Sequence, residues 1–162
     1  RYTKLNVNLS RLQSLSADLS LYAAASSQLT NRNLDSSEKI YLGGPIGVRA
    51  YPASEAGGSE GHTLTLELRQ RLSNNLTLSG FYDYGWIKVN RNNNVVSPAA
   101  PNDYALQGYG VSLTWQATPT IDMKATLSQR IDSNPAASTT TGNDSDGTKK
   151  ITRIWLSTGM AF

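Results

Sequence analysis

The sequence of 162 residues contains no cysteine and only one histidine, His62. Zinc sites built from Cys and His, and Cys-His catalytic pairs, therefore have too few residues of the right type. Serine and aspartate are frequent, but none lies in a nucleophile-elbow or phosphate-loop pattern. We expect no catalytic residue, no metal site and no cofactor, and we expect that the protein is not an enzyme.

Long apolar runs are also missing, so no segment approaches the roughly 20 apolar residues of a helical membrane span. Hydrophobic residues make up 38% of the chain and the mean hydropathy is -0.39, which is thin for a soluble core. The 15 basic and 12 acidic residues are scattered, and the net charge is only +3. Without a basic stripe, a nucleic acid partner is not expected. The first residue is Arg1 and not Met, and we expect a processed chain or a fragment.

The sequence does contain repeated alternation of apolar and polar residues, which places every second side chain on one face of a β-strand. In residues 63–72 the leucines face one way, and Thr65, Glu67 and Arg69 face the other. The pattern predicts about seven antiparallel strands, with lengths near those of tilted membrane strands, at residues 2–12, 17–29, 63–72, 76–90, 104–116, 120–131 and 150–162.

The predicted connections alternate between short and long. The short ones are 13–16, 73–75 and 117–119, and the long ones are 30–62, 91–103 and 132–149. Short periplasmic turns and long extracellular loops are typical of an outer-membrane β-barrel. The segment 132–149 has the most biased composition, and we expect it to be mobile.

Aromatic residues gather where a barrel would have its membrane-interface girdle: Tyr82, Tyr84, Trp86, Tyr104, Tyr109, Trp115 and Phe162. The alternative is that they are ordinary strand formers in a soluble sandwich. Leu156, Met160 and Phe162 share one face of the last predicted strand. Their pattern resembles the terminal signal by which the barrel-assembly machinery recognises outer-membrane proteins.

Seven strands are unsuited to closing an antiparallel barrel, because the first and last would run parallel. An open edge in lipid would leave backbone groups unpaired, at a prohibitive cost. The sequence therefore predicts the carboxyl-terminal part of a larger barrel. An eighth strand within 30–62 is the alternative.

Five motifs, in this order and spacing, carry a family resemblance: Leu34-Asp35-Ser36-Ser37-Glu38-Lys39, Leu42-Gly43-Gly44, Val48-Arg49-Ala50-Tyr51-Pro52, Leu66-Glu67-Leu68-Arg69 and Phe81-Tyr82-Asp83-Tyr84-Gly85. The chain resembles, over its whole length, the carboxyl-terminal half of two-partner secretion transporters (TpsB proteins) of the ShlB, FhaC and HecB type, in the BamA superfamily. The resemblance implies an all-β, sixteen-stranded antiparallel transmembrane barrel, of which residues 1–162 form the carboxyl-terminal portion. Residues 30–62 would then be a long extracellular loop that folds into the lumen.

The resemblance places Val48, Arg49, Ala50 and Tyr51 at the tip of that loop. The lumenal wall partners would be Asp83, Glu67, Arg69, Phe81 and Gly85; the alternation also puts Asp83 and Glu67 on the polar face. We expect Arg49 to pair with Asp83 and Glu67 as a latch, with Arg69 competing for Glu67. The alternative is that these are solvated charges, each worth under about 1 kcal/mol.

One motif departs from the family pattern Val-Arg-Gly-Tyr, because Ala50 stands where glycine is usual. If that position needs a positive φ, alanine would cost about 1 kcal/mol or more.

The resemblance implies an outer-membrane translocator of a Gram-negative bacterium that exports and activates a large partner exoprotein, such as a haemolysin or adhesin. Its partners would be that exoprotein, outer-membrane lipid and the barrel-assembly machinery. Two alternatives stay open: a barrel insertase like BamA or TamA, and a soluble β-sandwich adhesin or binding module.

Overall fold

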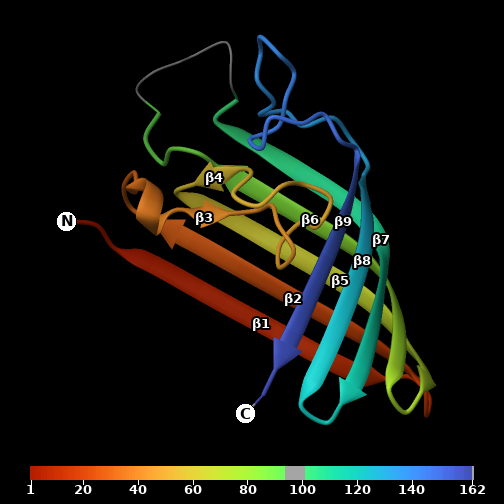
Figure 1. Ribbon diagram of the computed structural model, residues 1–162. Helices are drawn as coiled ribbons and strands as arrows, with labels where there is room; N and C mark the ends of the chain where they lie inside the picture. The colour runs from red at the N-terminus through yellow and green to blue at the C-terminus, as the bar shows by residue number, and fades with distance from the viewer. Residues whose placement is uncertain (94–100, 162) are drawn as a thin grey trace.

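The computed structural model describes residues 1–93 and 101–161, and its main feature is one curved antiparallel sheet (Figure 1). The seven strands of this sheet lie in the order β1-β2-β5-β6-β7-β8-β9. Their bounds are β1 Lys4–Ser14, β2 Leu19–Thr30, β5 Glu60–Ser73, β6 Leu76–Lys88, β7 Asp103–Thr118, β8 Ile121–Arg130 and β9 Thr152–Met160. The seven predicted strands are thus confirmed, with ends that differ by a few residues.

The long loop between β2 and β5 contributes no further strand to this sheet. It contains the short helix η1 (Ser36–Glu38) and the two-residue strands β3 (Ile40–Tyr41) and β4 (Gly57–Gly58), which pair only with each other. The alternative of an eighth wall strand is therefore wrong. The soluble β-sandwich is also wrong, because the described residues form one large sheet and this small pair, without a second sheet packed face to face.

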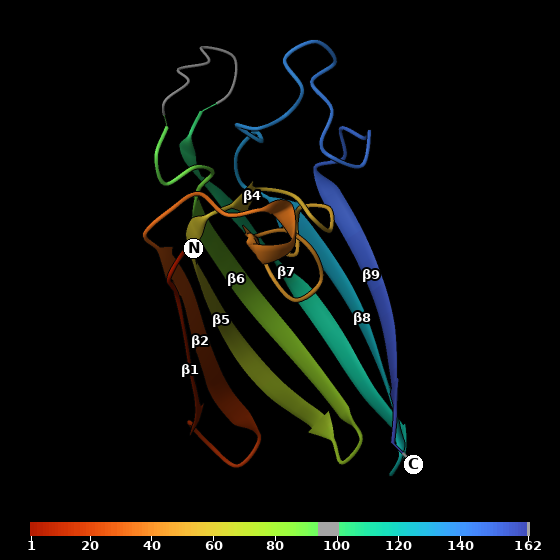
Figure 2. The same cartoon turned by 90° about the vertical axis from the view of Figure 1, so that its left-hand side faces the viewer.

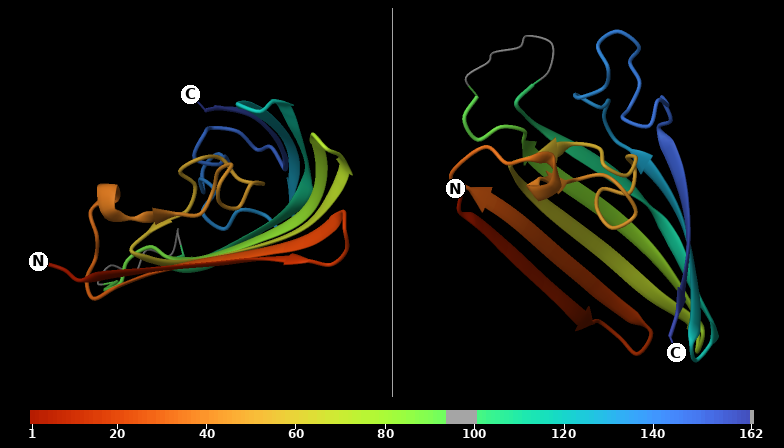
Figure 3. Two further views of the ribbon diagram at one scale, coloured as in Figure 1. Left: turned by 90° about the horizontal axis from the view of Figure 1, so that it is seen from below. Right: turned by 60° about the vertical axis from the view of Figure 1, so that its left-hand side comes forward.

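Short turns lie at one end of the sheet and long loops at the other (Figure 2). The sheet curves around a concave side and stays open, with β1 and β9 as its two edges (Figure 3). The β2–β5 loop, hereafter the long loop, lies on this concave side. Among residues 1–93 and 101–161 we find no helix whose length and apolar character would let it cross a membrane.

The two faces of the sheet follow the predicted alternation. Leu66 on β5 and Val111 on β7 are exposed on the convex face, whereas Glu67, Asp83 and Ser112 on the concave face are buried. Tyr109 and Trp115 also lie exposed on the convex face.

The prediction of a girdle position is wrong for one residue, Tyr104, and a second residue, Phe162, lies outside the residues that the structure describes. Tyr104 pairs in register with Ile87 and packs on the concave side, against the apolar cluster under the long loop. It therefore belongs to the contact with that loop. Phe162 falls outside the described residues.

The apolar core lies between the long loop and the concave face of the sheet, hereafter the wall. Leu42, Val48, Ala50, Tyr51 and Ala56 come from the loop, and Ile87 of β6 and Leu106 of β7 come from the sheet. All seven side chains are at most 5% exposed. This small cluster is the apolar part of the contact between the long loop and the sheet.

The β8–β9 loop, residues 131–151, makes polar contacts within itself and with the sheet. The backbone N–H of Ser138 donates to the carbonyl of Asn143, and that of Asp144 donates to the carbonyl of Thr148. The Asp144 side chain is buried. The expectation that this segment is mobile stays a prediction.

Candidate functional site: the buried arginine of the long loop

The site lies on the concave face where β5 and β6 run side by side. Their register pairs Glu67 with Phe81 and Thr65 with Asp83, so four inward side chains form adjacent rungs. Alternation along two paired strands thereby delivers two carboxylates to one patch of wall.

Arg49 of the long loop binds both carboxylates. Its Nε and Nη2 donate to Oδ2 and Oδ1 of Asp83, each at 2.8 Å, which is the bidentate geometry. Its Nη1 donates to Oε1 of Glu67 at 2.6 Å. Thr65 Oγ1 donates to Oδ1 of Asp83 at 3.0 Å and holds this carboxylate in place.

The backbone of Arg49 is bound as well as its side chain. Its N–H donates to Asp83 Oδ2 at 3.1 Å. Its carbonyl oxygen accepts from Ser128 Oγ on β8 and from Trp155 Nε1 on β9, both at 2.7 Å. One loop residue therefore joins β5, β6, β8 and β9.

Aromatic rings cover the two guanidinium groups. The Arg49 guanidinium lies 3.4 Å from the ring centroid of Phe81, and that of Arg69 lies 4.1 Å from the centroid of Tyr22. Arg69 Nη2 binds Oε2 of Glu67 at 2.6 Å, while Arg49 takes Oε1. The two arginines thus share Glu67, one oxygen each, and the expected competition is absent.

The central groups are buried: Arg49, Glu67 and Asp83 are 4%, 5% and 1% exposed. Burial alone lowers the pKa of the Arg49 guanidinium, but the hydrogen bonds and charges of Asp83 and Glu67 together outweigh it, and the pKa is raised above its usual value. With Arg69, the cluster contains two positive and two negative groups. A neutral, hydrogen-bonded cluster is the arrangement in which buried charges are tolerated.

Glycines on the wall make room for the loop. A Cβ on Gly85 would lie 3.0 Å from Val48 Cγ2, and one on Gly108 would lie 2.4 Å from Ala50 Cβ. Gly85, predicted as a wall partner, therefore contributes space and not a polar contact.

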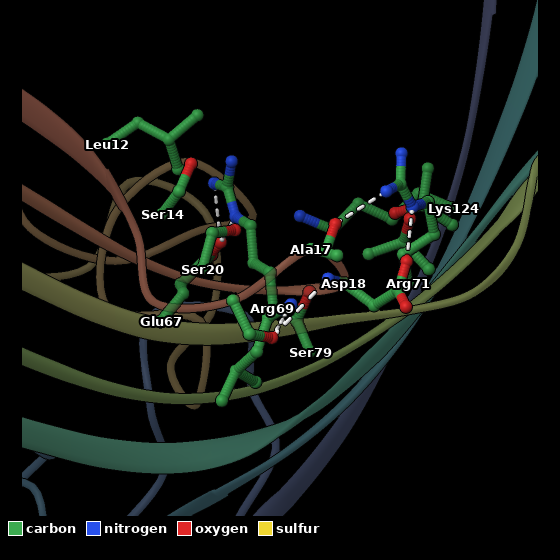
Figure 4. A pocket seen from close by; sticks show the side chains of 14 residues that line it. Leu12, Ser14, Ala17, Asp18, Ser20, Glu67, Arg69, Arg71, Ser79 and Lys124 are labelled. Carbon is green, nitrogen blue, oxygen red and sulfur yellow. Dashed lines mark hydrogen bonds and ion pairs between the residues drawn. The ribbon is translucent and has the colours of Figure 1, made fainter.

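A cavity of about 470 Å³ borders the cluster on the side of the short turns. Figure 4 shows the side chains that line it. The charged groups in its lining are Glu67, Arg69, Arg71, Asp18 and Lys124. Within the described residues no group of three or more His, Cys, Asp or Glu is placed to hold a metal ion.

A family model described as "Haemolysin secretion/activation protein ShlB/FhaC/HecB" matches residues 1–114, which carry the long loop, Glu67 and Asp83. The chain belongs to this family.

Curated relatives agree with that placement. The chain is 29% identical over 137 residues to the heme/hemopexin transporter protein HuxB of Haemophilus influenzae strain 86-028NP, covering 82% of this chain and 24% of HuxB. HuxB of strain Rd matches with the same identity and coverage. The chain thus spans about a quarter of the length of these relatives.

The structure of CdiB from Acinetobacter baumannii matches with a TM-score of 0.68 and 15% identity, over 98% of this chain and 27% of that one. At this identity the match shows the fold alone. The seven-stranded sheet therefore shares its fold with about a quarter of that chain.

Sequence reasoning missed two wall residues that bind the Arg49 carbonyl. Ser128 and Trp155 both fall on the inward parity of their strands, and that parity was the available signal. Of the predicted terminal signal, Leu156 and Met160 are exposed on β9, and Phe162 lies outside the described residues.

Proposed function

We propose that this chain forms the carboxyl-terminal part of an outer-membrane barrel of a Gram-negative bacterium. The barrel exports a large partner exoprotein by two-partner secretion. The concave face is the lumen, the convex face contacts lipid, and the long loop is held in the lumen by Arg49. The barrel-assembly machinery recognises its carboxyl-terminal strand during insertion.

The distribution of side chains over the two faces supports a membrane location. Exposed leucines and aromatic rings line the convex face, where a soluble protein would lose solubility. The concave face is lined by hydroxyl and charged groups, as in a hydrated conduit. The strands of 9 to 16 residues are long enough to cross the apolar layer with a tilt.

The latch is supported by four hydrogen bonds that Arg49 donates to the carboxylates of Asp83 and Glu67, three from its side chain and one from its backbone. Removing one partner from such a buried pair costs about 3–5 kcal/mol, because the remaining charge is left unpaired. The loop also occupies the space that an unfolded exoprotein would pass through. Passage therefore requires the loop to shift, and Arg49 sets the cost of that shift.

The test is export of the cognate exoprotein by the full-length parent carrying Asp83→Asn or Arg49→Gln. Insertion is checked by heat-modifiable mobility on gels. We expect export to fall about tenfold or more with insertion kept. The matched control is Arg71→Gln, since Arg71 and Asp18 form an exposed pair with side chains 54% and 57% accessible. Unchanged export by both inserted site variants would refute the latch.

A further inference from the structure

A second buried charge cluster lies at the outer end of the sheet, apart from the Arg49 site. Asp144, from the β8–β9 loop, accepts from Arg130 Nη1 at 3.1 Å and Nη2 at 2.7 Å. Arg153 Nη2 donates to the same carboxylate at 3.1 Å, and Asn134 Nδ2 donates at 3.0 Å. The Arg130 and Asp144 side chains are 7% and 1% accessible.

This cluster anchors the β8–β9 loop to the wall. Arg130 is the last residue of β8 and Arg153 is the second residue of β9, so two neighbouring strands hold one loop carboxylate. Arg130 also donates to the carbonyl of Lys150, at the other end of the loop.

The anchored loop in turn contacts the tip of the long loop. The guanidinium of Arg130 lies 5.2 Å from the ring centroid of Tyr51, and Tyr51 Oη donates to the carbonyl of Asp132 at 3.3 Å. Glu55 Oε2 accepts from the N–H of Ser145, next to Asp144, at 2.8 Å. The left view of Figure 3 shows the two loops side by side on the concave side.

We propose that Arg130 and Asp144 are positioning residues that hold the long loop from outside, through Tyr51 and Glu55. The proposal rests on the latch function proposed above. Arg49 fixes the inner side of the tip to the wall, and the β8–β9 loop closes over its outer side. The positions of the two loops are then coupled, because Tyr51 cannot leave the sheet without breaking its contacts with Arg130 and Asp132.

The β8–β9 loop then controls the release of the long loop from the sheet. A partner that binds this loop from outside, or an exoprotein that displaces it on emerging, would release the outer hold on Tyr51. The contacts of Arg49 then set the remaining free-energy barrier to movement of the long loop.

The test is the rate at which a membrane-impermeant maleimide labels the full-length parent that carries Val48→Cys as its only cysteine. Val48 is 1% exposed beside Arg49, so labelling reports release of the tip. Adding Asp144→Asn is expected to raise the rate on the order of tenfold, the effect of weakening hydrogen bonds between charged groups. The control Asp146→Asn cuts an exposed contact with Arg153 and leaves Arg130–Asp144 intact, and we expect a change of less than about twofold.

A general loss of barrel stability is a separate explanation for faster labelling. It is excluded if the variant and the parent lose the folded band on gels at the same temperature. If Asp144→Asn does not insert, Glu55→Ala serves instead, since it cuts only the contact between the loops. A raised rate supports the proposal, and an unchanged rate overturns it.

A third arm separates this proposal from the proposed function. If Arg49→Gln raises labelling and Asp144→Asn does not, the positioning role is refuted and the latch stands. If Arg49→Gln leaves labelling unchanged, the latch is refuted, and the positioning role, which rests on it, is overturned as well.

Discussion

The methyl group of Ala50 fills the space that Gly108 leaves open on the concave face of β7. A Cβ on Gly108 would lie 2.4 Å from the Cβ of Ala50. Ala50 is not among the described residues with positive φ, which apart from glycine are Ser54 and Ala56. The strain considered for alanine at this position is therefore absent, and the residue is instead fitted to its seat on the wall.

Gly108→Ala should displace the loop tip, because two methyl groups cannot share this space. We expect a loss of about 1–3 kcal/mol in the free energy of unfolding, measured by denaturant titration of the full-length parent in detergent. Ala50→Gly combined with Gly108→Ala should recover most of that loss, since the nearest remaining atom is the Gln129 oxygen at 3.2 Å. Additive losses in the double variant would contradict the fit.

Exchanging the charges of Arg49 and Asp83 should not restore the closed loop. In Arg49→Asp with Asp83→Arg, the new carboxylate would face Glu67, and the N–H of residue 49 would lose its acceptor. We expect the double variant to remain as conductive in planar bilayers as Arg49→Gln. Arg49→Lys should fall between, because an ammonium group does not form the bidentate pair. Parent-like closure of the exchanged variant would show that only the charge matters.

Trp155→Phe and Ser128→Ala should have strongly non-additive effects. Either change leaves one donor for the Arg49 carbonyl, whereas both together leave a buried oxygen unpaired, at about 1–3 kcal/mol. Hydrogen exchange of residues 42–51 in the full-length protein should therefore speed up mainly in the double variant. Trp115→Phe on the exposed convex face is the control. Equal effects in the singles and the double would argue against this carbonyl as an anchor.

A positive charge on the convex face should impair insertion. Leu66→Arg would place a guanidinium in lipid, at about 2–4 kcal/mol near the bilayer midplane. Thr114→Lys, which lines the concave cavity, should insert normally. The folded fraction in lipid vesicles, read from gel mobility, compares the two. An equal decrease of the folded fraction in both variants would mean that the convex face does not contact lipid.

Acid should weaken the Arg153–Asp146 contact only at very low pH. The hydrogen bond from Arg153 is the main cause that lowers the pKa of the Asp146 carboxyl to about 2. The folded value lies below the unfolded one, about 3.9, so the contact contributes stability above pH 4 and loses it as the pH falls toward 2. Carbon NMR of labelled aspartate should give a midpoint near 2 for this carboxyl, and Asp146→Asn assigns the signal. A midpoint near 4 would show that the pair is solvated.

The two faces of the sheet were predictable from residue order alone. Alternation put Leu66 outside and Glu67 inside, and the spacing of turn residues placed short and long connections at opposite ends. Both follow from the period of a β-strand, which is local and does not depend on distant residues. The pairing of Arg49 with Asp83 needed the family resemblance as well, since 34 positions separate the two residues.

The sequence by itself therefore determined the strands, their inward and outward faces and the loop that carries Arg49. Only the tertiary structure decided what meets that loop. Trp155 is 106 positions from Arg49, and Ser145 is 90 positions from Glu55. Contacts at such separation depend on how strongly the sheet curves and how the β8–β9 loop folds back. Neither property is encoded in local periodicity, because both arise from packing between segments far apart in the chain.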